Sequence, residues 1–161
     1  ERAPFRTAAK LGMCVNLFAN HHFYWGDEHY ALTVGPDRAT RMNACRTALD
    51  SGVPMAIHSD APVTPLGPLF TAWAAVNRIT ASGRVQGEEE RIQVHEALWA
   101  ITMGAAYTLH LDGEIGSIET GKKADFAVLE ADPTACDPML LKDIGVWGTV
   151  QGGRIFPAAS L

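Results

Sequence analysis

The sequence predicts an α/β fold, and three observations support that prediction. Residues 13–18 and residues 53–58 are short apolar runs bounded by turn-forming residues, which is the pattern of buried strands. Between them, residues 36–51 repeat apolar side chains at helical spacing. The order strand, helix, strand describes a βαβ unit, whose right-handed crossover makes the two strands parallel. The carboxyl ends of both strands therefore open on the same side of the sheet.

The elements around this unit follow in order along the first third of the chain. Residues 6–10 form the last turns of a helix that precedes the first strand. Residues 20–30 follow the first strand as an extended exit that is rich in aromatic and titratable side chains. The helix at residues 36–51 starts at Pro36, which suits a first turn, and ends at Gly52, directly before the second strand.

Two helices are predicted after the second strand. Residues 69–79 form an apolar helix, and residues 94–103 form an amphipathic one that residues 104–111 extend by a short helical turn. Residues 81–90 form a polar excursion between the helices, and the run Glu88–Glu90 is predicted to be a solvated charge run. Two tryptophans in these helices are predicted to be in the core: Trp73 and Trp99.

The character of the sequence changes at residue 112. Residues 112–125 are rich in turn-forming residues, and short strands are predicted at residues 126–129, 146–150 and 154–156. Gly152-Gly153 supplies a hairpin turn between the last two strands. We therefore expect a strand-rich tail with no helical layer of its own.

Composition excludes several functional classes. The 161 residues are 47% hydrophobic and 19% charged, with a net charge of −5, which is typical of a globular domain. Lysine and arginine are not clustered, so neither nucleic acid nor an anionic membrane is an expected partner. No apolar run approaches membrane-spanning length. The expected partner is a small-molecule substrate.

The cysteines and the absence of common motifs narrow the choice further. Three widely spaced cysteines (Cys14, Cys45 and Cys136) suit a reducing compartment, so we expect a cytoplasmic protein in which Cys14 and Cys45 are inert core thiols. No CxxC, GxGxxG, Walker or GxSxG pattern occurs, which argues against a cysteine metal site, a nucleotide loop and a serine hydrolase.

Candidate functional residues lie where the two predicted strands end. His58 and Asp60 follow the second strand, and His21 and His22 follow the first. If the strands are parallel neighbours, these four side chains lie close together, at the edge where α/β proteins place their chemistry. His22 is preferred over His21 for facing the pocket, because neighbours in an extended segment point to opposite sides.

Each candidate also has a simpler interpretation. Asp60 could be an Asx-turn residue that shapes the chain before Pro62. His58 could be a hydrogen-bonded, partly buried histidine. The aromatic run Phe23-Tyr24-Trp25 could form a substrate wall or pack the exit down. Three further histidines are predicted to lie on the surface: His29, His95 and His110.

Three segments resemble the C-terminal part of the amidohydrolase superfamily, in particular its YtcJ-like and N-substituted formamide deformylase-type members. His58-Ser59-Asp60-Ala61-Pro62-Val63 resembles the family's Gly-Ser-Asp-Ala-Pro-Val segment after the last barrel strand. Residues 96–106 resemble the final barrel helix. Residues 113–129, with the pattern Gly-x-Ile-x-x-Gly-Lys-x-Ala-Asp, resemble the strand segment that follows it. His58 departs from the family, in which a small residue is common at this position.

The resemblance implies an architecture. The expected fold is the C-terminal portion of a (β/α)8 TIM barrel, with strands 7 and 8 and their helices, followed by strands of a small β-sandwich. Residues 1–111 then belong to the barrel and residues 112–161 to the composite β-sandwich domain. The first-strand His-x-His, the bridging ligand and the other histidines of the family are not found in this chain, which implies the C-terminal part of a longer protein.

The resemblance also implies a chemistry. In the family, one or two divalent metals, commonly zinc, activate a water that attacks an amide-like carbonyl. Asp60 matches the aspartate that binds the metal and moves the proton. His21 and His22 lie where the family places substrate-contacting side chains, and His58 is expected either to contact the substrate or to support Asp60. We expect a fragment of a hydrolase of carbon–nitrogen bonds that binds zinc weakly, if at all, and is inactive alone.

Two alternatives stay open at this point. The chain could be a non-catalytic fragment that self-associates through the exposed barrel edge, so a homo-oligomer is expected. The same barrel could also act on a different bond, such as an ester.

Overall fold

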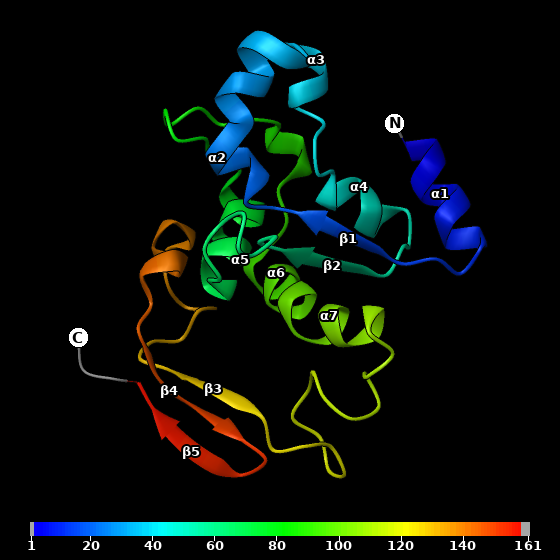
Figure 1. Cartoon of the computed structure of the whole chain (residues 1–161). Helices are drawn as coiled ribbons and strands as arrows, with labels where there is room; N and C mark the ends of the chain where they lie inside the picture. The colour runs from blue at the N-terminus through cyan, green and yellow to red at the C-terminus, as the bar shows by residue number, and fades with distance from the viewer. Residues whose placement is uncertain (1, 159–161) are drawn as a thin grey trace.

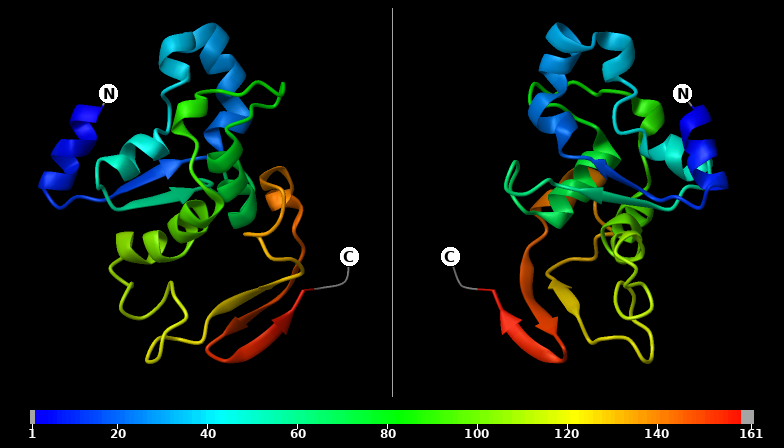
Figure 2. Two further views of the ribbon diagram at one scale, coloured as in Figure 1. Left: turned by 180° about the vertical axis from the view of Figure 1, so that it is seen from behind. Right: turned by 45° about the vertical axis from the view of Figure 1, so that its right-hand side comes forward.

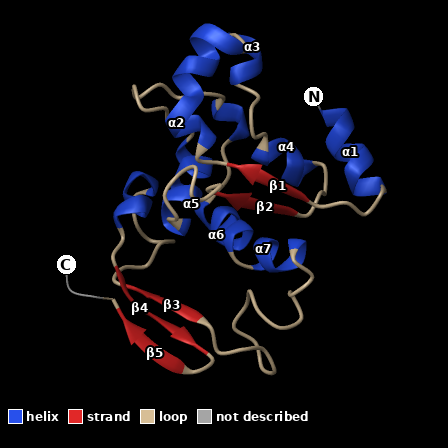
Figure 3. Ribbon diagram, viewed as in Figure 1, coloured by secondary structure: helices blue, strands red, loops and turns tan. Residues whose placement is uncertain are grey.

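The computed structural model describes residues 2–158 and contains two regions of different architecture (Figure 1). The first holds a two-stranded parallel sheet with helices around it, and the second is a three-stranded antiparallel sheet near the C-terminus (Figure 3). Residue 1 and residues 159–161, which the predicted domain bounds include, lie outside the described part. None of the described helices is both long and apolar enough to cross a membrane.

The predicted βαβ unit is confirmed. β1 (Val15–Phe18) pairs in parallel with β2 (Met55–His58), with Phe18 opposite His58 at the carboxyl ends. The crossover runs through α4 (Cys45–Asp50), which lies on one side of the pair. α6 (Val94–Ile101) and α7 (Met103–Thr108) cover the other side (Figures 1 and 2). α1 (Arg2–Lys10) packs beside α4.

The core lies around β2 and α5 (Pro68–Asn77). Met55 and Ile57 are buried there, as are all α5 residues from Thr71 to Asn77. A helix that is apolar all round must be covered all round, and α5 contacts β2, α6 and the 3₁₀-helix η3 (Pro138–Asp143). The core prediction for Trp73 is confirmed, since the side chain is 3% exposed and its Nε1 donates to the Met139 carbonyl at 3.0 Å.

The prediction for Trp99 is wrong, because its side chain is 43% exposed. The helical stripe of α6 explains the difference. The apolar positions Val94, Ala97 and Ile101 follow a spacing of three and four residues, and residue 99 falls outside that stripe. Trp99 instead covers the backbone at Gly104, where an added Cβ would lie 2.9 Å from the indole ring and 2.2 Å from the Met55 carbonyl oxygen. That close approach lets α7 pack directly on β2.

The predicted single helix at residues 36–51 is two helices, α3 (Pro36–Ala39) and α4. The backbone unwinds between them, with Asn43 at a φ of +46°. The cause is a buried cation: the Arg78 guanidinium is fully buried and donates to the carbonyls of Thr40, Met42 and Asn43 at 2.9–3.0 Å. A continuous helix would use those carbonyls internally, so the break supplies the acceptors that the buried charge requires.

The exit at residues 20–30 is not extended as predicted. It forms α2 (His21–Glu28), which continues into a single π-helical turn, η1 (His29–Thr33). Phe23 packs edge-to-face on Phe70 and Trp73, with ring centroids 5.3 and 5.9 Å apart. The helix is therefore held by tertiary packing against α5, and Phe23 packs the exit down.

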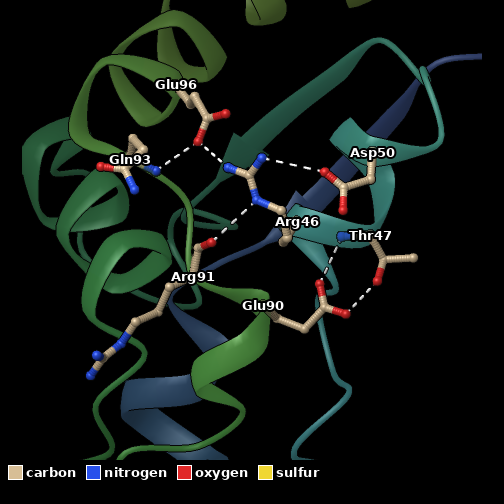
Figure 4. Close-up of polar contacts among 7 residues, drawn as sticks. All are labelled: Arg46, Thr47, Asp50, Glu90, Arg91, Gln93 and Glu96. Atoms are coloured by element: carbon tan, nitrogen blue, oxygen red, sulfur yellow. Dashed lines mark hydrogen bonds and ion pairs between the residues drawn. The ribbon is translucent and has the colours of Figure 1, made fainter.

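The predicted solvated charge run is wrong for Glu90, which is buried within η2 (Glu88–Glu90). Ala44, the N-cap residue of α4, has no side-chain acceptor for the free N–H groups of the first turn. The Glu90 carboxylate caps the helix instead, because it accepts hydrogen bonds from the Thr47 backbone N–H at 2.8 Å and from the Thr47 hydroxyl (Figure 4). A carboxylate at a helix N-terminus also complements the helix dipole.

A second polar connection joins α4 to α6. Arg46 donates to Glu96, to Asp50 and to the Arg91 carbonyl, and Glu96 also accepts from the backbone N–H of Gln93 in a capping box (Figure 4). Residues 90–96 thus tie the crossover helix to the helix on the other side of the sheet.

The strand-rich tail is confirmed as predicted. β3 (Phe126–Leu129), β4 (Val146–Gln151) and β5 (Arg154–Pro157) form an antiparallel sheet in that order. Gly152 and Gly153, both at positive φ, make the turn between β4 and β5. Every described residue of β5 is exposed. The tail is joined to the core through Leu141 of η3, which is fully buried beside α5.

Candidate active site

The carboxyl ends of β1 and β2 hold a cluster of aromatic and imidazole rings. The ring of Phe18 stacks on His21 at 4.9 Å and on His58 at 5.2 Å between centroids. Trp25, one turn along α2, meets the His21 ring edge-on at 5.3 Å. The parallel register places Phe18 beside His58, so the sheet itself brings the two exit segments together.

Asp60 lies two residues beyond β2 and is exposed. The turn that follows is closed by its backbone, since the Asp60 carbonyl accepts the Val63 N–H at 2.7 Å. Within residues 2–158 the carboxylate itself makes no hydrogen bond, so its side chain does not shape an Asx turn. The negative charge of Asp60 raises the pKa of His21, but burial and the neighbouring His29 lower this pKa by more. The free carboxylate is able to take a metal ligand's role or a proton.

His21 is held at one ring nitrogen. Its Nε2 lies 2.9 Å from Nε2 of His29, and Nδ1 of His29 lies 2.6 Å from the Thr33 hydroxyl. Burial and the neighbouring His29 lower the pKa of His21, which favours a neutral ring at pH 7. His29, which was predicted to lie on the surface, is half-buried and takes part in this contact.

The premise for preferring His22 is wrong, because residues 21 and 22 are helical and not extended. His22 is 1% exposed, and its Nε2 donates to the Met42 carbonyl at 3.0 Å. Burial and the nearby Arg78 charge lower the pKa of His22 to about 3. The structure therefore brings His21, His58 and Asp60 together and places the His22 ring inside the protein, against the break between α3 and α4.

Two residues that sequence reasoning missed fix the loop after β2. Thr64 donates its hydroxyl hydrogen to the Ser59 carbonyl, and Asn20 Nδ2 donates to Thr64 Oγ1 at 2.9 Å. Asn20 and Thr64 are buried. Both are polar residues in the segments that follow the two strands, but only the paired strands show that the two side chains meet.

A cavity of about 180 Å³ opens beside the end of β2. Its lining is mainly apolar, with one imidazole and two hydroxyls: Ile57, His58, Ser59, Leu66, Pro68, Thr71 and Ile101. In the described part of the chain, no group of three His, Cys, Asp or Glu side chains is arranged to hold a metal ion. Asp60 fits a metal as a single ligand, and the described residues do not complete a site.

Comparisons with known proteins identify a family. The sequence model of the amidohydrolase family matches residues 2–157 of this chain. The chain is 33% identical over 152 residues to the amidohydrolase YtcJ of Bacillus subtilis strain 168, covering 92% of this chain and 28% of YtcJ. It is 31% identical over 155 residues to the N-substituted formamide deformylase of Arthrobacter pascens, covering 95% of this chain and 28% of the deformylase.

A solved structure shares the fold. A metal-dependent hydrolase from Pyrococcus horikoshii OT3 superposes with a TM-score of 0.71 at 20% identity, covering 86% of this chain and 28% of that one. At this identity the likeness concerns the fold alone. The chain thus spans a little more than a quarter of the length of the two curated relatives.

Proposed function

Because this chain belongs to the amidohydrolase family, we propose that it is the part of a metal-dependent hydrolase that contributes Asp60 to cleavage of carbon–nitrogen, amide-like bonds in a small molecule. The observation that supports the proposal is the free carboxylate of Asp60 at the carboxyl end of β2, next to His21 and His58. Relatives with amidohydrolase and deformylase names support the reaction class.

The proposed architecture follows the same lines. β1 and β2 are the seventh and eighth strands of a (β/α)8 TIM barrel, and residues 1–111 belong to it. Residues 112–161 supply strands of a β-sandwich domain. The parallel pairing of β1 with β2 and the helices on both sides support this assignment, since parallel strands are covered on both faces in barrels of this type.

The proposed roles are divided among the side chains at the strand ends. A divalent metal, zinc in this proposal, lowers the pKa of a bound water and polarises the carbonyl when it is present. One oxygen of the Asp60 carboxylate would hold the metal, and the other would accept a proton from the attacking water and return it to the leaving nitrogen. His21 and His58 contact and orient the substrate. His22 has no substrate role in this proposal, because its ring is buried and bonded to the Met42 carbonyl.

Metal analysis of the purified chain tests the cofactor part of the proposal. Because no group of three ligand side chains occurs among the described residues, we expect well under one zinc per chain and no turnover by the chain alone. Tight, stoichiometric zinc on the isolated chain would contradict it.

The catalytic role of Asp60 is tested in the longer protein that the proposal implies, expressed from its complete gene. Asp60→Asn keeps the size and removes the charge, so amide hydrolysis should fall by about 10² or more. Asp37→Asn, at an exposed position of α3, is the matched control and should keep full activity. Equal activity of the Asp60→Asn variant and the wild type would overturn the role.

Self-association of the isolated chain is a second candidate. Among the described strands, β1 and β2 pair only with each other, so each has one free edge. Free edges favour pairing with another chain, and we propose a homo-oligomer on this ground. Light scattering should show a mass that rises with concentration, and a monomer throughout would contradict it.

The three cysteines also enter the proposal. Cys14, Cys45 and Cys136 are all free thiols, and free thiols persist in reducing compartments. We therefore place the protein in the cytoplasm, which fractionation of cells with a tagged chain would test.

A further inference from the structure

The contact between His21 and His29 is unusual for a helix. Side chains that meet along a regular helix lie three or four residues apart, whereas these two are eight apart. The continuous segment α2–η1 carries both, and its π-helical turn contains His29 and Thr33. π-turns are rare in helices and occur often at functional sites.

The two Nε2 atoms, 2.9 Å apart, share one hydrogen. One neutral ring donates and the other accepts, because two protonated or two bare nitrogens would repel each other. The other nitrogen of His29 is also engaged, at 2.6 Å from the Thr33 hydroxyl. His29 is thereby held at both nitrogens, and His21 is held at Nε2.

Nδ1 of His21 is left free. Within residues 2–158 it has no hydrogen-bond partner, and it is not among the buried polar atoms. His21 also stacks on Phe18, which stacks on His58 beside Asp60. The ring plane is set by Phe18, the ring rotation is set by His29, and one nitrogen at the candidate site is left without a partner among the described residues.

We propose that His29, held by Thr33, is a positioning residue that engages Nε2 of His21, couples the tautomer of His21 to its own, and so makes Nδ1 the nitrogen that His21 presents to the substrate. This inference rests on the proposed function, in which His21 contacts the substrate. A polar atom of the substrate, such as an amide oxygen or nitrogen, then meets Nδ1, whose donor or acceptor character is the opposite of that of the engaged Nε2.

The test reads the tautomer of His21 directly. In the chain labelled with ¹⁵N at histidine, long-range proton–nitrogen spectra report the fraction of each neutral tautomer. His29→Ala removes the partner, and we expect the tautomer ratio of His21 to change about fivefold, which corresponds to the roughly 1 kcal/mol of one hydrogen bond. His29→Gln offers an amide in the place of Nε2 and should restore most of the wild-type ratio.

Matched controls make the result specific. Thr33→Val removes the hydroxyl but keeps the shape, and should shift the ratio in the same direction as His29→Ala. His95→Ala, at an exposed helical position, should leave it unchanged. An unchanged ratio in His29→Ala would overturn the inference, as would an equal shift in His95→Ala.

Activity separates this inference from the function on which it rests. In the complete protein, His29→Ala should lower kcat/KM about fivefold or more with the metal content unchanged, and His29→Gln should recover it. An unchanged kcat/KM would overturn the role of His29 in positioning. If the wild type shows no hydrolysis at all, the proposed function fails, while the tautomer spectra still decide whether His29 fixes His21.

Discussion

The parallel pair β1–β2 and the antiparallel sheet β3–β5 differ in how their residues are covered. Met55, Ala56 and Ile57 of β2 are all buried, and helices lie on both sides of the pair. By contrast, β5 is exposed throughout, and Trp147 of β4 is 50% exposed. The polar networks follow the same division, since the caps and buried charges around Arg46, Arg78 and Glu90 all lie in the first region. A side chain can be held for chemistry only where its surroundings are fixed, and the candidate site lies at the end of the covered sheet.

The largest expected difference between the regions concerns their tryptophans. Trp73→Ala removes a buried ring and its bond to the Met139 carbonyl, and should lower the free energy of unfolding by about 4 kcal/mol. Trp147→Ala in β4 should cost under about 1 kcal/mol, because half of that ring is already in water. Urea unfolding monitored by far-UV circular dichroism measures both. Equal losses would show that the tail sheet is as tightly packed as the core.

The pH dependence of stability should come from the covered region. The folded-state pKa of His22 is about 3, below its usual 6.5, so the unfolded chain binds the proton more tightly. This contribution to stability is complete above pH 6.5 and is lost progressively as the pH falls towards 3, by about 2 kcal/mol at pH 5.

Paired variants isolate the His22 contribution. Urea unfolding at pH 7 and pH 5 should show a smaller pH effect for His22→Gln than for the wild type. His95→Gln, at an exposed position, should behave as the wild type does. A wild-type pH effect that survives in His22→Gln would contradict the assignment to the buried ring.

The smallest of the three effects concerns two adjacent glutamates. Glu90→Gln weakens the cap on α4, and we expect a loss of about 1 kcal/mol. Glu89→Gln, one residue earlier and exposed, should change stability by less than about 0.5 kcal/mol. Thermal unfolding of the two variants measures this difference. Equal midpoint temperatures would show that the Glu90 carboxylate does not cap α4.

Local signals predicted some elements closely. β3 has the predicted bounds of residues 126–129, and the glycine pair at 152–153 makes the predicted turn. The strands at the site were also recognisable, because short apolar runs between turn residues are visible in the sequence alone.

Features that depend on distant residues could not be predicted. The break between α3 and α4 exists because Arg78, far along the chain, needs the Thr40 and Met42 carbonyls. The sequence of α2 has no clear apolar stripe that would predict a helix, and its packing on Phe70 appears only in three dimensions. For the same reason the sequence did not reveal that His21, and not His22, lies at the candidate site. Which of two adjacent imidazoles faces outward depends on the local backbone conformation.

Two hydrogen bonds of Thr64, one to the Ser59 carbonyl and one from the Asn20 amide, affect ligand affinity. Ordering a flexible loop on binding costs conformational entropy, and each immobilised side chain adds to that cost. Here the segment after β2 is already fastened to the exit of β1 before any ligand arrives. A ligand that contacts this loop therefore joins a segment whose freedom was lost during folding, and more of the interaction energy is left for binding.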